Sequence, residues 1–288
     1  MNSRLLLLSP AKVNLFLRVL RKRDDGYHDI ITLMQPVTLH DEISIEVKSG
    51  DGISVSCDSA QVPDGSGNLA YIAAEHLLKS ADIRKEIRIR IKKHIPVAAG
   101  LGGGSSNAAT VLMGLNDALK AGLSEAELLS IGGRLGSDVP FFMLGGPALA
   151  RGRGTELERV RLPRYWYVLI NPGFKVSTSW AYNNLDLTKG PKNNILPYSV
   201  SDFNDMERLK DHLVNDLETV TLRKHPEISS LKKALIENGA SSALMSGSGP
   251  TVFGIFRDAE AAQSACKALK NGLDASHSVF LTEGIEHA

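Results

Sequence analysis

A run of glycines in the middle of the chain constrains its fold more than any other feature. Four of the five residues from Gly100 to Gly104 are glycine, and a packed helix or strand would lose stability with so many, because glycine loses the most backbone freedom on folding. The run follows a strand-like alternation at residues 87–92 and precedes Ser105 and Ser106, which are typical helix N-cap residues. Strand, glycine loop and helix N-terminus together predict a phosphate site, because free N–H groups and the helix dipole both favour an anion there.

Two common phosphate-binding patterns are excluded for this loop. No Gly-Lys-Ser/Thr follows it as in a P-loop, and Ser105 occupies the place of the third glycine of the dinucleotide fingerprint. A structural turn remains the alternative on local sequence alone.

Composition narrows the class of protein. The chain has 288 residues, of which 43% are hydrophobic and 23% charged, which is ordinary for one large globular domain or two smaller ones. A net charge of +1 provides no field that would recruit nucleic acid or an anionic membrane. Cys57 and Cys266 are too far apart to suggest a zinc site or a disulfide framework. The apolar start at residues 4–8 is too short for a signal peptide and is interpreted as a strand. We expect a cytoplasmic protein with no nucleic-acid, membrane or obligate protein partner.

Residues that could take part in catalysis or in substrate binding also lie near the N-terminus. Strands are expected at residues 5–8 and 13–20, and Lys12 and Asn14 share a face if the segment between is extended. That face could be solvated or functional. Asp25-Gly26 marks a turn, so Tyr27-His28 is either plain surface or a base-binding pair, since a ring and an imidazole can address the face and the edge of a base.

Periodicity predicts the remaining elements. Residues 43–47 and 53–57 are expected to pair as neighbouring strands. Asn68 is expected to cap a helix over 70–79, and Ser124 to open another with a capping box. Asp138 is either a cap or a partly buried functional carboxylate. The expected later helices are 213–222, 227–238 and 259–270, and the strands are 148–151, 166–170, 252–256 and 278–283.

The C-terminal half shows the order β-α-β-β-α-β, which predicts a ferredoxin-like arrangement. A polar tract at residues 189–194 is expected to form a surface loop or a lid.

Three motifs together resemble those of the GHMP kinases, which include galactokinase, homoserine kinase and mevalonate kinase. They are Pro10-Ala-Lys-Val-Asn-Leu-Phe-Leu17, the glycine loop that starts at Pro96, and Gly247-Ser-Gly249. The loop departs from the family pattern by two inserted glycines and by Asn107 before the alanines. This variant, together with Asp25-Gly-Tyr-His28, resembles the branch whose substrate carries a cytidine diphosphate.

The resemblance implies an α+β fold with two lobes. The N-terminal lobe, residues 1–160, would resemble domain 2 of ribosomal protein S5, and the C-terminal lobe, residues 161–288, would be ferredoxin-like. It implies phosphoryl transfer from ATP, with Mg²⁺, to a small-molecule cytidine-diphosphate alcohol. The third motif would pack beside the phosphate loop.

The resemblance also assigns residues to roles. Asp138 would be the catalytic carboxylate, with Lys12 near the reacting hydroxyl, and Ser106 could ligate the metal. The substrate would contact Asn14, Tyr27, His28, Thr178 and Tyr182, with Tyr27 and Tyr182 on either side of the cytosine. The ATP-binding residues would be Asn68, Leu69, Lys93, Pro96, Val97, Ala98, Ala99, Gly100, Leu101, Gly102, Gly103, Gly104, Ser105 and Ser106.

Three alternatives remain at this point. Another small-alcohol kinase, of the homoserine or mevalonate type, would not need Tyr27 and His28 because its substrate lacks a base. A non-catalytic sensing relative would be expected to lack Lys12 or Asp138, and both are present. An RNA-binding module would need a basic surface, which a net charge of +1 disfavours.

Overall fold

A computed structural model describes residues 3–187 and 205–287. The described residues form two compact units that interleave along the chain. Unit 1 comprises the residues up to Ala11, His40–Val97 and Gly102–Leu144, and unit 2 comprises Lys12–Leu39, Ala98–Leu101 and the residues from Gly145 onward. The division at residue 160 stays a prediction, and the tract at 189–194 lies outside the described residues.

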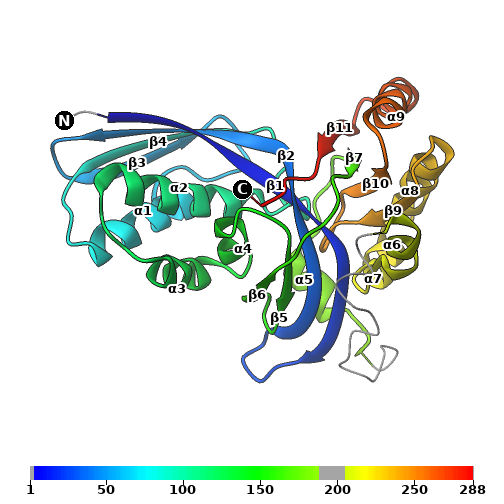
Figure 1. Cartoon of the computed structure of the whole chain (residues 1–288), viewed down its shortest axis with the longest axis horizontal. Helices are drawn as coiled ribbons and strands as arrows, with labels where there is room; N and C mark the ends of the chain where they lie inside the picture. The colour runs from blue at the N-terminus through cyan, green and yellow to red at the C-terminus, as the bar shows by residue number, and fades with distance from the viewer. Residues whose placement is uncertain (1–2, 188–204, 288) are drawn as a thin grey trace. The chain divides into compact units, whose positions relative to one another are not determined.

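Unit 1 is a sheet with helices on one of its faces (Figure 1). The strands follow the order β3-β4-β2-β1, with β4 antiparallel to β2 and parallel to β3. β1 and β2 each have one end in this unit and the other in unit 2. The elements that lie wholly or partly in unit 1 are β1 (Ser3–Lys22), β2 (His28–Lys48), β3 (Gly52–Cys57), β4 (Glu86–Lys92), α1 (Leu69–Ser80), α2 (Gly103–Leu119), α3 (Glu125–Leu135) and α4 (Val139–Met143).

The periodicities of the sequence explain how this unit packs. Ile87, Ile89 and Ile91 of β4 are buried, whereas the arginines between them are exposed. The predicted helix face of α1, Ala70, Ala73, Ala74 and Leu77, is fully buried. A Cβ on Gly114 of α2 would overlap the Leu7 side chain of β1, so the helix backbone lies close to the sheet at this point.

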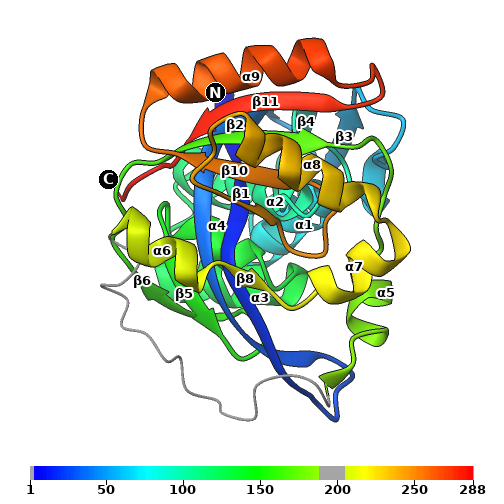
Figure 2. The ribbon, with the colours of Figure 1, turned by 90° about the vertical axis from the view of Figure 1, so that its right-hand side faces the viewer.

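Unit 2 contains a second, four-stranded sheet. Its strands follow the order β11-β7-β10-β9 and all neighbours are antiparallel. If these four strands are numbered along the chain, their order across the sheet is 4-1-3-2. Helices connect strand 1 to strand 2 and strand 3 to strand 4, which confirms the ferredoxin-like prediction. α8 and α9 cover one face of the sheet (Figure 2). The elements are β5 (Ala148–Arg151), β6 (Glu156–Arg159), β7 (Trp166–Asn171), β8 (Val214–Asn215), β9 (Ser242–Met245), β10 (Val252–Phe256), β11 (Ser278–Glu283), α5 (Thr178–Asn183), α6 (Met206–His212), α7 (Glu218–Lys224), α8 (Glu227–Glu237) and α9 (Ala259–Gly272).

Three local expectations were wrong. β1 is one continuous strand through Ser9-Pro10, where two strands were expected. β3 pairs with β4 and not with β2, because β4 occupies the place between them. The expected helix over 213–222 starts only at Glu218, since Val214 and Asn215 pair in parallel with Phe16 and Leu17 of β1.

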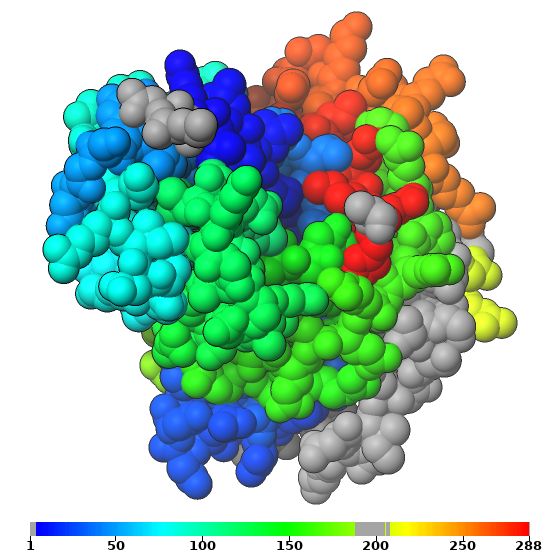
Figure 3. Space-filling view, turned by 60° about the vertical axis from the view of Figure 1, so that its left-hand side comes forward, coloured from blue at the N-terminus to red at the C-terminus, as the bar shows by residue number. Residues whose placement is uncertain are grey.

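The C-terminal residues of unit 2 lie against the segment that precedes β5. The His287 Nε2 atom lies 2.9 Å from the Pro147 carbonyl oxygen, and Figure 3 shows this red segment in contact with green residues. Along the described residues, no helix combines the length and apolar character needed to cross a bilayer.

Candidate active site

The glycine loop leads directly into the N-terminus of α2. The helix begins at Gly103, and its N-cap is Gly102 with a left-handed φ of 71°. Ser105 and Ser106 therefore lie inside the first turn, and the expectation that they cap the helix was wrong. Gly102 has no side chain that could cap this helix, and the first N–H groups of a helix have no intrahelical partner. The first turn of α2 can therefore donate hydrogen bonds to an anion.

Gly100 shows why the loop needs glycine. Its φ is +78°, and an added Cβ would overlap the carbonyl oxygen of Ser246. The Ser246 hydroxyl donates to the Gly100 carbonyl oxygen over 2.9 Å, and the Thr251 N–H donates to the Ala99 carbonyl oxygen over 3.4 Å. These contacts confirm that the third motif packs beside the glycine loop. Ala98 also has a left-handed φ, 54°, a conformation that costs a non-glycine residue about 1–2 kcal/mol.

Lys93 places a positive charge at the same helix terminus. Its side chain is only 8% exposed and donates a hydrogen bond to Asp41. The Nζ atom lies 3.0 Å from the point where a Cβ on Gly103 would stand. The ammonium group is thus beside the first turn of α2, where a phosphate would meet both. ATP binding by Lys93 and by the loop stays a prediction.

The hydroxyl of Ser106 belongs to a buried hydrogen-bond chain. Ser106 is fully buried and accepts from the Ser9 hydroxyl over 2.7 Å, and Ser9 accepts from the Asn107 amide over 2.9 Å. A hydroxyl oxygen has two lone pairs, so Ser106 retains an acceptor position that a metal could use.

Asn68 caps α1, as the sequence predicted. Its Oδ1 atom accepts from the Ala70 N–H over 2.9 Å, and its amide donates to the Pro63 carbonyl oxygen over 2.9 Å. Leu69, the first residue of α1, lies with Cδ1 3.7 Å from where a Cβ on Gly104 would stand. Leu69 therefore lies beside the first turn of α2, and contact of Asn68 and Leu69 with the adenine stays a prediction.

Lys12 and Asn14 share one face of β1 and are buried, at 4% and 2% exposure, so a solvated strand face is excluded. The Lys12 Nζ atom donates to Asn14 Oδ1 over 2.5 Å. The Asn14 N–H donates to the Ser246 hydroxyl over 3.3 Å, and a Cβ on Gly247 would stand 3.5 Å from Lys12 Nζ. Unit 2 thus brings the first and third motifs together.

Asp138 lies in unit 1, immediately before the short helix α4. It is half-buried and takes the N-cap position, where no cap hydrogen bond from the described backbone to its side chain is found. Lys12 lies in unit 2. That the two side chains act on one hydroxyl stays a prediction.

Three of the expected substrate residues of unit 2 carry rings: a buried His28, a partly buried Tyr182 in contact with it, and an exposed Tyr27. His28 is 8% exposed, and its ring centroid lies 5.1 Å from that of Tyr182, with the planes inclined by 31°. Tyr27 is 50% exposed, and the Arg153 guanidinium lies 3.8 Å from its ring centroid. Burial lowers the pKa of His28, and the nearby Lys22 lowers it further. A neutral imidazole offers one donor and one acceptor to a base edge.

Thr178 links α5 to the third motif. Its hydroxyl lies 3.0 Å from the Ser248 hydroxyl. The expected substrate residue Thr178 is thus anchored beside Gly247, whose own neighbours are Asn14 and Lys12.

Two buried residues were missed by sequence reasoning. The Asn215 amide donates to the carbonyl oxygens of Met245 and Gly247, each over 2.7 Å, and so holds the third motif. Asp41 is fully buried and binds the chain before the glycine loop. The alternation of Ile43, Ile45 and Val47, continued back by two residues, would have placed Asp41 on the buried face.

The described residues offer few side chains that could ligate a metal ion. Among them, no group of three or more His, Cys, Asp or Glu side chains could hold a metal ion. Mg²⁺ commonly keeps several waters and binds through one or two protein ligands plus substrate phosphates. A magnesium ion here would have to be held largely by nucleotide phosphates, and its binding stays a prediction.

The chain matches known proteins along most of its length. The model of the GHMP kinases N terminal domain matches residues 68–146, and that of the GHMP kinases C terminal domain matches residues 199–275. A Syntrophotalea carbinolica protein named 4-diphosphocytidyl-2-C-methyl-D-erythritol kinase is 50% identical over 92% of this chain and 94% of its own length. A protein of the same name from Syntrophus aciditrophicus is 47% identical over 97% of this chain and 99% of its own.

A solved structure agrees with these relatives. The crystal structure of a 4-(cytidine 5'-diphospho)-2C-methyl-D-erythritol kinase matches with a TM-score of 0.82 and 34% identity, over 97% of this chain and 99% of that one. The crystal structure of L. major mevalonate kinase matches with a TM-score of 0.74 at 15% identity, over 100% of this chain and 97% of that one, which shows a shared fold. The α+β fold class is thereby confirmed, and the chain belongs to the GHMP kinase family.

Proposed function

We infer that the chain is an ATP-dependent kinase that phosphorylates the 2-hydroxyl of 4-diphosphocytidyl-2-C-methyl-D-erythritol, a step of non-mevalonate isoprenoid synthesis. The observation that carries this inference is the 47–50% identity, over nearly the whole chain, to relatives that bear this kinase's name. The solved structure of the same kinase supports it at 34% identity. A homoserine or mevalonate kinase is less well supported, because those structural matches lie at 23% identity or below.

The glycine loop and the N-terminus of α2 would bind the phosphates of ATP. Gly102 leaves the first-turn N–H groups without a described cap, and Lys93 adds a cation beside them. Asn68 and Leu69 would contact the adenine. Bound Mg²⁺ would neutralise phosphate charge, and the Ser106 hydroxyl would be its protein ligand.

Asp138 would accept the proton of the reacting hydroxyl as its oxygen attacks the γ-phosphorus, with the bond to the β-phosphate breaking on the opposite side. Lys12 would favour the ionised forms of the hydroxyl and of Asp138, because a nearby positive charge lowers the pKa of an acid. Phosphoryl transfer of this kind depends on positioning and charge neutralisation more than on covalent catalysis.

Residues of unit 2 would bind the cytidine-diphosphate alcohol. Tyr27, His28 and Tyr182 would address the base, and Asn14 and Thr178 would bind polar groups of the substrate. The hydrogen bonds of Asn14 to Lys12 and of Thr178 to Ser248 support this assignment, since they fix both side chains beside the third motif.

Product analysis tests the function. We expect ATP and the cytidine-diphosphate alcohol to yield ADP and a product whose ³¹P spectrum retains the diphosphate and gains one phosphomonoester. Carbon–phosphorus coupling should place that group on the oxygen of carbon 2. ATP hydrolysis without a new phosphomonoester, or phosphorylation at another hydroxyl, would contradict the proposal.

A further inference from the structure

We propose that Asp41 is the positioning residue of the phosphate-binding loop, and that its carboxylate fixes both ends of the loop and the Lys93 ammonium beside α2. The proposal deepens the ATP-binding role inferred above and rests on it. Asp41 stands two residues before Ile43, on the buried face of β2, and it is 0% exposed.

The Asp41 carboxylate accepts four hydrogen bonds within unit 1. Its Oδ1 atom accepts from the backbone N–H groups of His94 and Ile95, each over 2.9 Å. Its Oδ2 atom accepts from Lys93 Nζ and, over 2.9 Å, from the Asn107 amide. A carboxylate offers about four lone-pair positions. Asp41 therefore uses its acceptor capacity entirely on the surroundings of the loop.

The four partners stand on both sides of the glycines. His94 and Ile95 immediately precede Pro96, where the loop begins, and Asn107 is the fifth residue of α2, where it ends. Glycine-rich backbone is free to adopt many conformations, so its N–H groups converge on an anion only if the two ends are held. One buried side chain holds both.

The positive charge of Lys93 adds an electrostatic contribution to this arrangement. Its Nζ atom stands close to Gly103 in the first turn of α2, where the helix dipole disfavours a cation. The negative charge of the Asp41 carboxylate offsets this unfavourable interaction between Lys93 and the helix dipole. A bound phosphate group with several negative charges would offset the same interaction further. The site therefore favours a highly charged anion over a singly charged one.

The same network reaches the proposed metal ligand. The Asn107 amide that binds Asp41 also donates to the Ser9 hydroxyl over 2.9 Å, and Ser9 donates to Ser106 over 2.7 Å. Asp41 thereby sets the position of Asn107 and, through Ser9, of the Ser106 hydroxyl.

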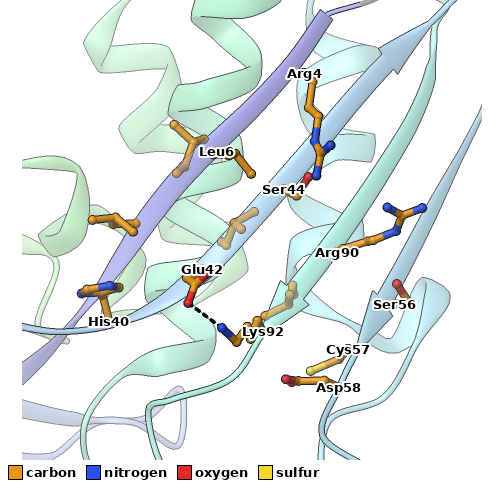
Figure 4. Close-up of a pocket in the computed structure, with 14 residues that line it drawn as sticks. Arg4, Leu6, His40, Glu42, Ser44, Ser56, Cys57, Asp58, Arg90 and Lys92 are labelled. Atoms are coloured by element: carbon orange, nitrogen blue, oxygen red, sulfur yellow. Dashed lines mark hydrogen bonds and ion pairs between the residues drawn. The ribbon is translucent and has the colours of Figure 1, made fainter.

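Asp41→Asn is the variant that tests the proposal, and Glu42→Gln is its matched control. The asparagine keeps one oxygen for the two backbone N–H groups but presents an NH₂ group to two donors, Lys93 and Asn107. Glu42, the next residue, is exposed and pairs at the surface with His94 and with Lys92, as Figure 4 shows for Lys92. Glu42→Gln therefore makes the same chemical change at a carboxylate that contacts the His94 ring but none of the four groups that donate to Asp41.

Calorimetric binding of ATP and of AMP, each without acceptor, provides the readout. We expect Asp41→Asn to weaken ATP about 10- to 100-fold, the range for hydrogen bonds to charged groups, and to weaken AMP less. Glu42→Gln should bind both like the parent, and the KM for the cytidine-diphosphate alcohol should change little in either variant. Unchanged ATP affinity in folded Asp41→Asn protein, or equal losses for ATP and AMP, would overturn the proposal.

Asn107→Ala tests the proposal independently of the folding of Asp41→Asn. It frees the helix end of the loop but leaves the carboxylate paired with Lys93, and should weaken ATP about 2- to 10-fold. ATP affinity equal to the parent's in this variant would also overturn the proposal. Binding is measured without acceptor, so this test does not depend on the proposed substrate. A parent protein that binds ATP but does not phosphorylate the cytidine-diphosphate alcohol would refute the proposed function. The ATP affinities of the variants would still decide the role of Asp41.

Discussion

The rings of His28 and Tyr182 lie in direct contact, with centroids 5.1 Å apart and planes inclined by 31°. This separation is within the usual range for aromatic pairs, about 4.5–7 Å. Tyr27, in contrast, is half-exposed and has the Arg153 guanidinium on its ring. His28 and the partly buried Tyr182 therefore lie ring to ring within unit 2, and the stacking of Tyr27 and Tyr182 on either side of the cytosine stays a prediction.

Tyr182→Ala should raise the KM for the cytidine-diphosphate alcohol about tenfold or more and leave the KM for ATP nearly unchanged. Base–aromatic stacking contributes roughly 1–3 kcal/mol per base, and Tyr182→Phe should restore the parent value because the ring face does the stacking. Tyr71→Ala, on α1, is the control. Tyr182 also packs against the core of unit 2, so a lowered melting temperature with an unchanged substrate KM would assign it a structural role only.

The burial of His28 should make stability depend on pH. Its pKa is lowered from 6.5 in the folded protein, first by burial and then by Lys22. Below about pH 6.5 the unfolded chain therefore binds this proton more readily than the folded one, and the free energy of unfolding falls until the folded histidine also protonates. We therefore expect the free energy of unfolding, measured by denaturant titration, to fall less between about pH 7.5 and about pH 5.5 in His28→Asn than in the parent. Parallel pH curves for the two proteins would contradict this.

Asp138→Asn should lower kcat by about 10²–10⁴-fold, the usual contribution of a general base, and leave ATP binding intact. The amide keeps the shape of the side chain and loses the charge and the proton acceptor. Asp117→Asn, at an exposed position of α2, should turn over like the parent. Near-parental kcat in Asp138→Asn would restrict Asp138 to its N-cap position before α4.

Gly100→Ala should destabilise the protein far more than Gly122→Ala. Both glycines have a left-handed φ, +78° and +74°, but a Cβ on Gly122 meets nothing within 4 Å, whereas one on Gly100 overlaps the Ser246 carbonyl oxygen. Gly122→Ala should cost about 1–2 kcal/mol for the backbone conformation alone. Chemical denaturation of both variants measures the difference, and equal losses would show that the loop moves away from Ser246 at little cost.

Local periodicity was enough to predict most elements, because each is defined by residues close in sequence. The alternation at Ile87–Ile91 predicted β4, and the capping box at Ser124 is formed as expected. β3 could not be assigned correctly in this way, since its partner β4 arrives only after α1 and local alternation does not encode which strand a strand pairs with.

The candidate site was predicted only where a motif was visible. Lys12 and Asn14 do share a buried face, and the third motif does contact Gly100. Asp41 and Asn215 were missed, because a single buried Asp or Asn has the same local sequence signature as a surface one. Their roles depend on hydrogen bonds to residues 52 to 66 positions away for Asp41 and 30 to 32 positions away for Asn215.

The measurement that tests the central claim most directly is the rate of ADP formation with four acceptors, each at equal concentration: the cytidine-diphosphate alcohol, mevalonate, homoserine and galactose. We expect ATP turnover, dependent on Mg²⁺, with the cytidine-diphosphate alcohol and only background with the other three. Equal or faster turnover of mevalonate, homoserine or galactose would contradict the assigned substrate and, with it, the proposed roles of Tyr27, His28 and Tyr182.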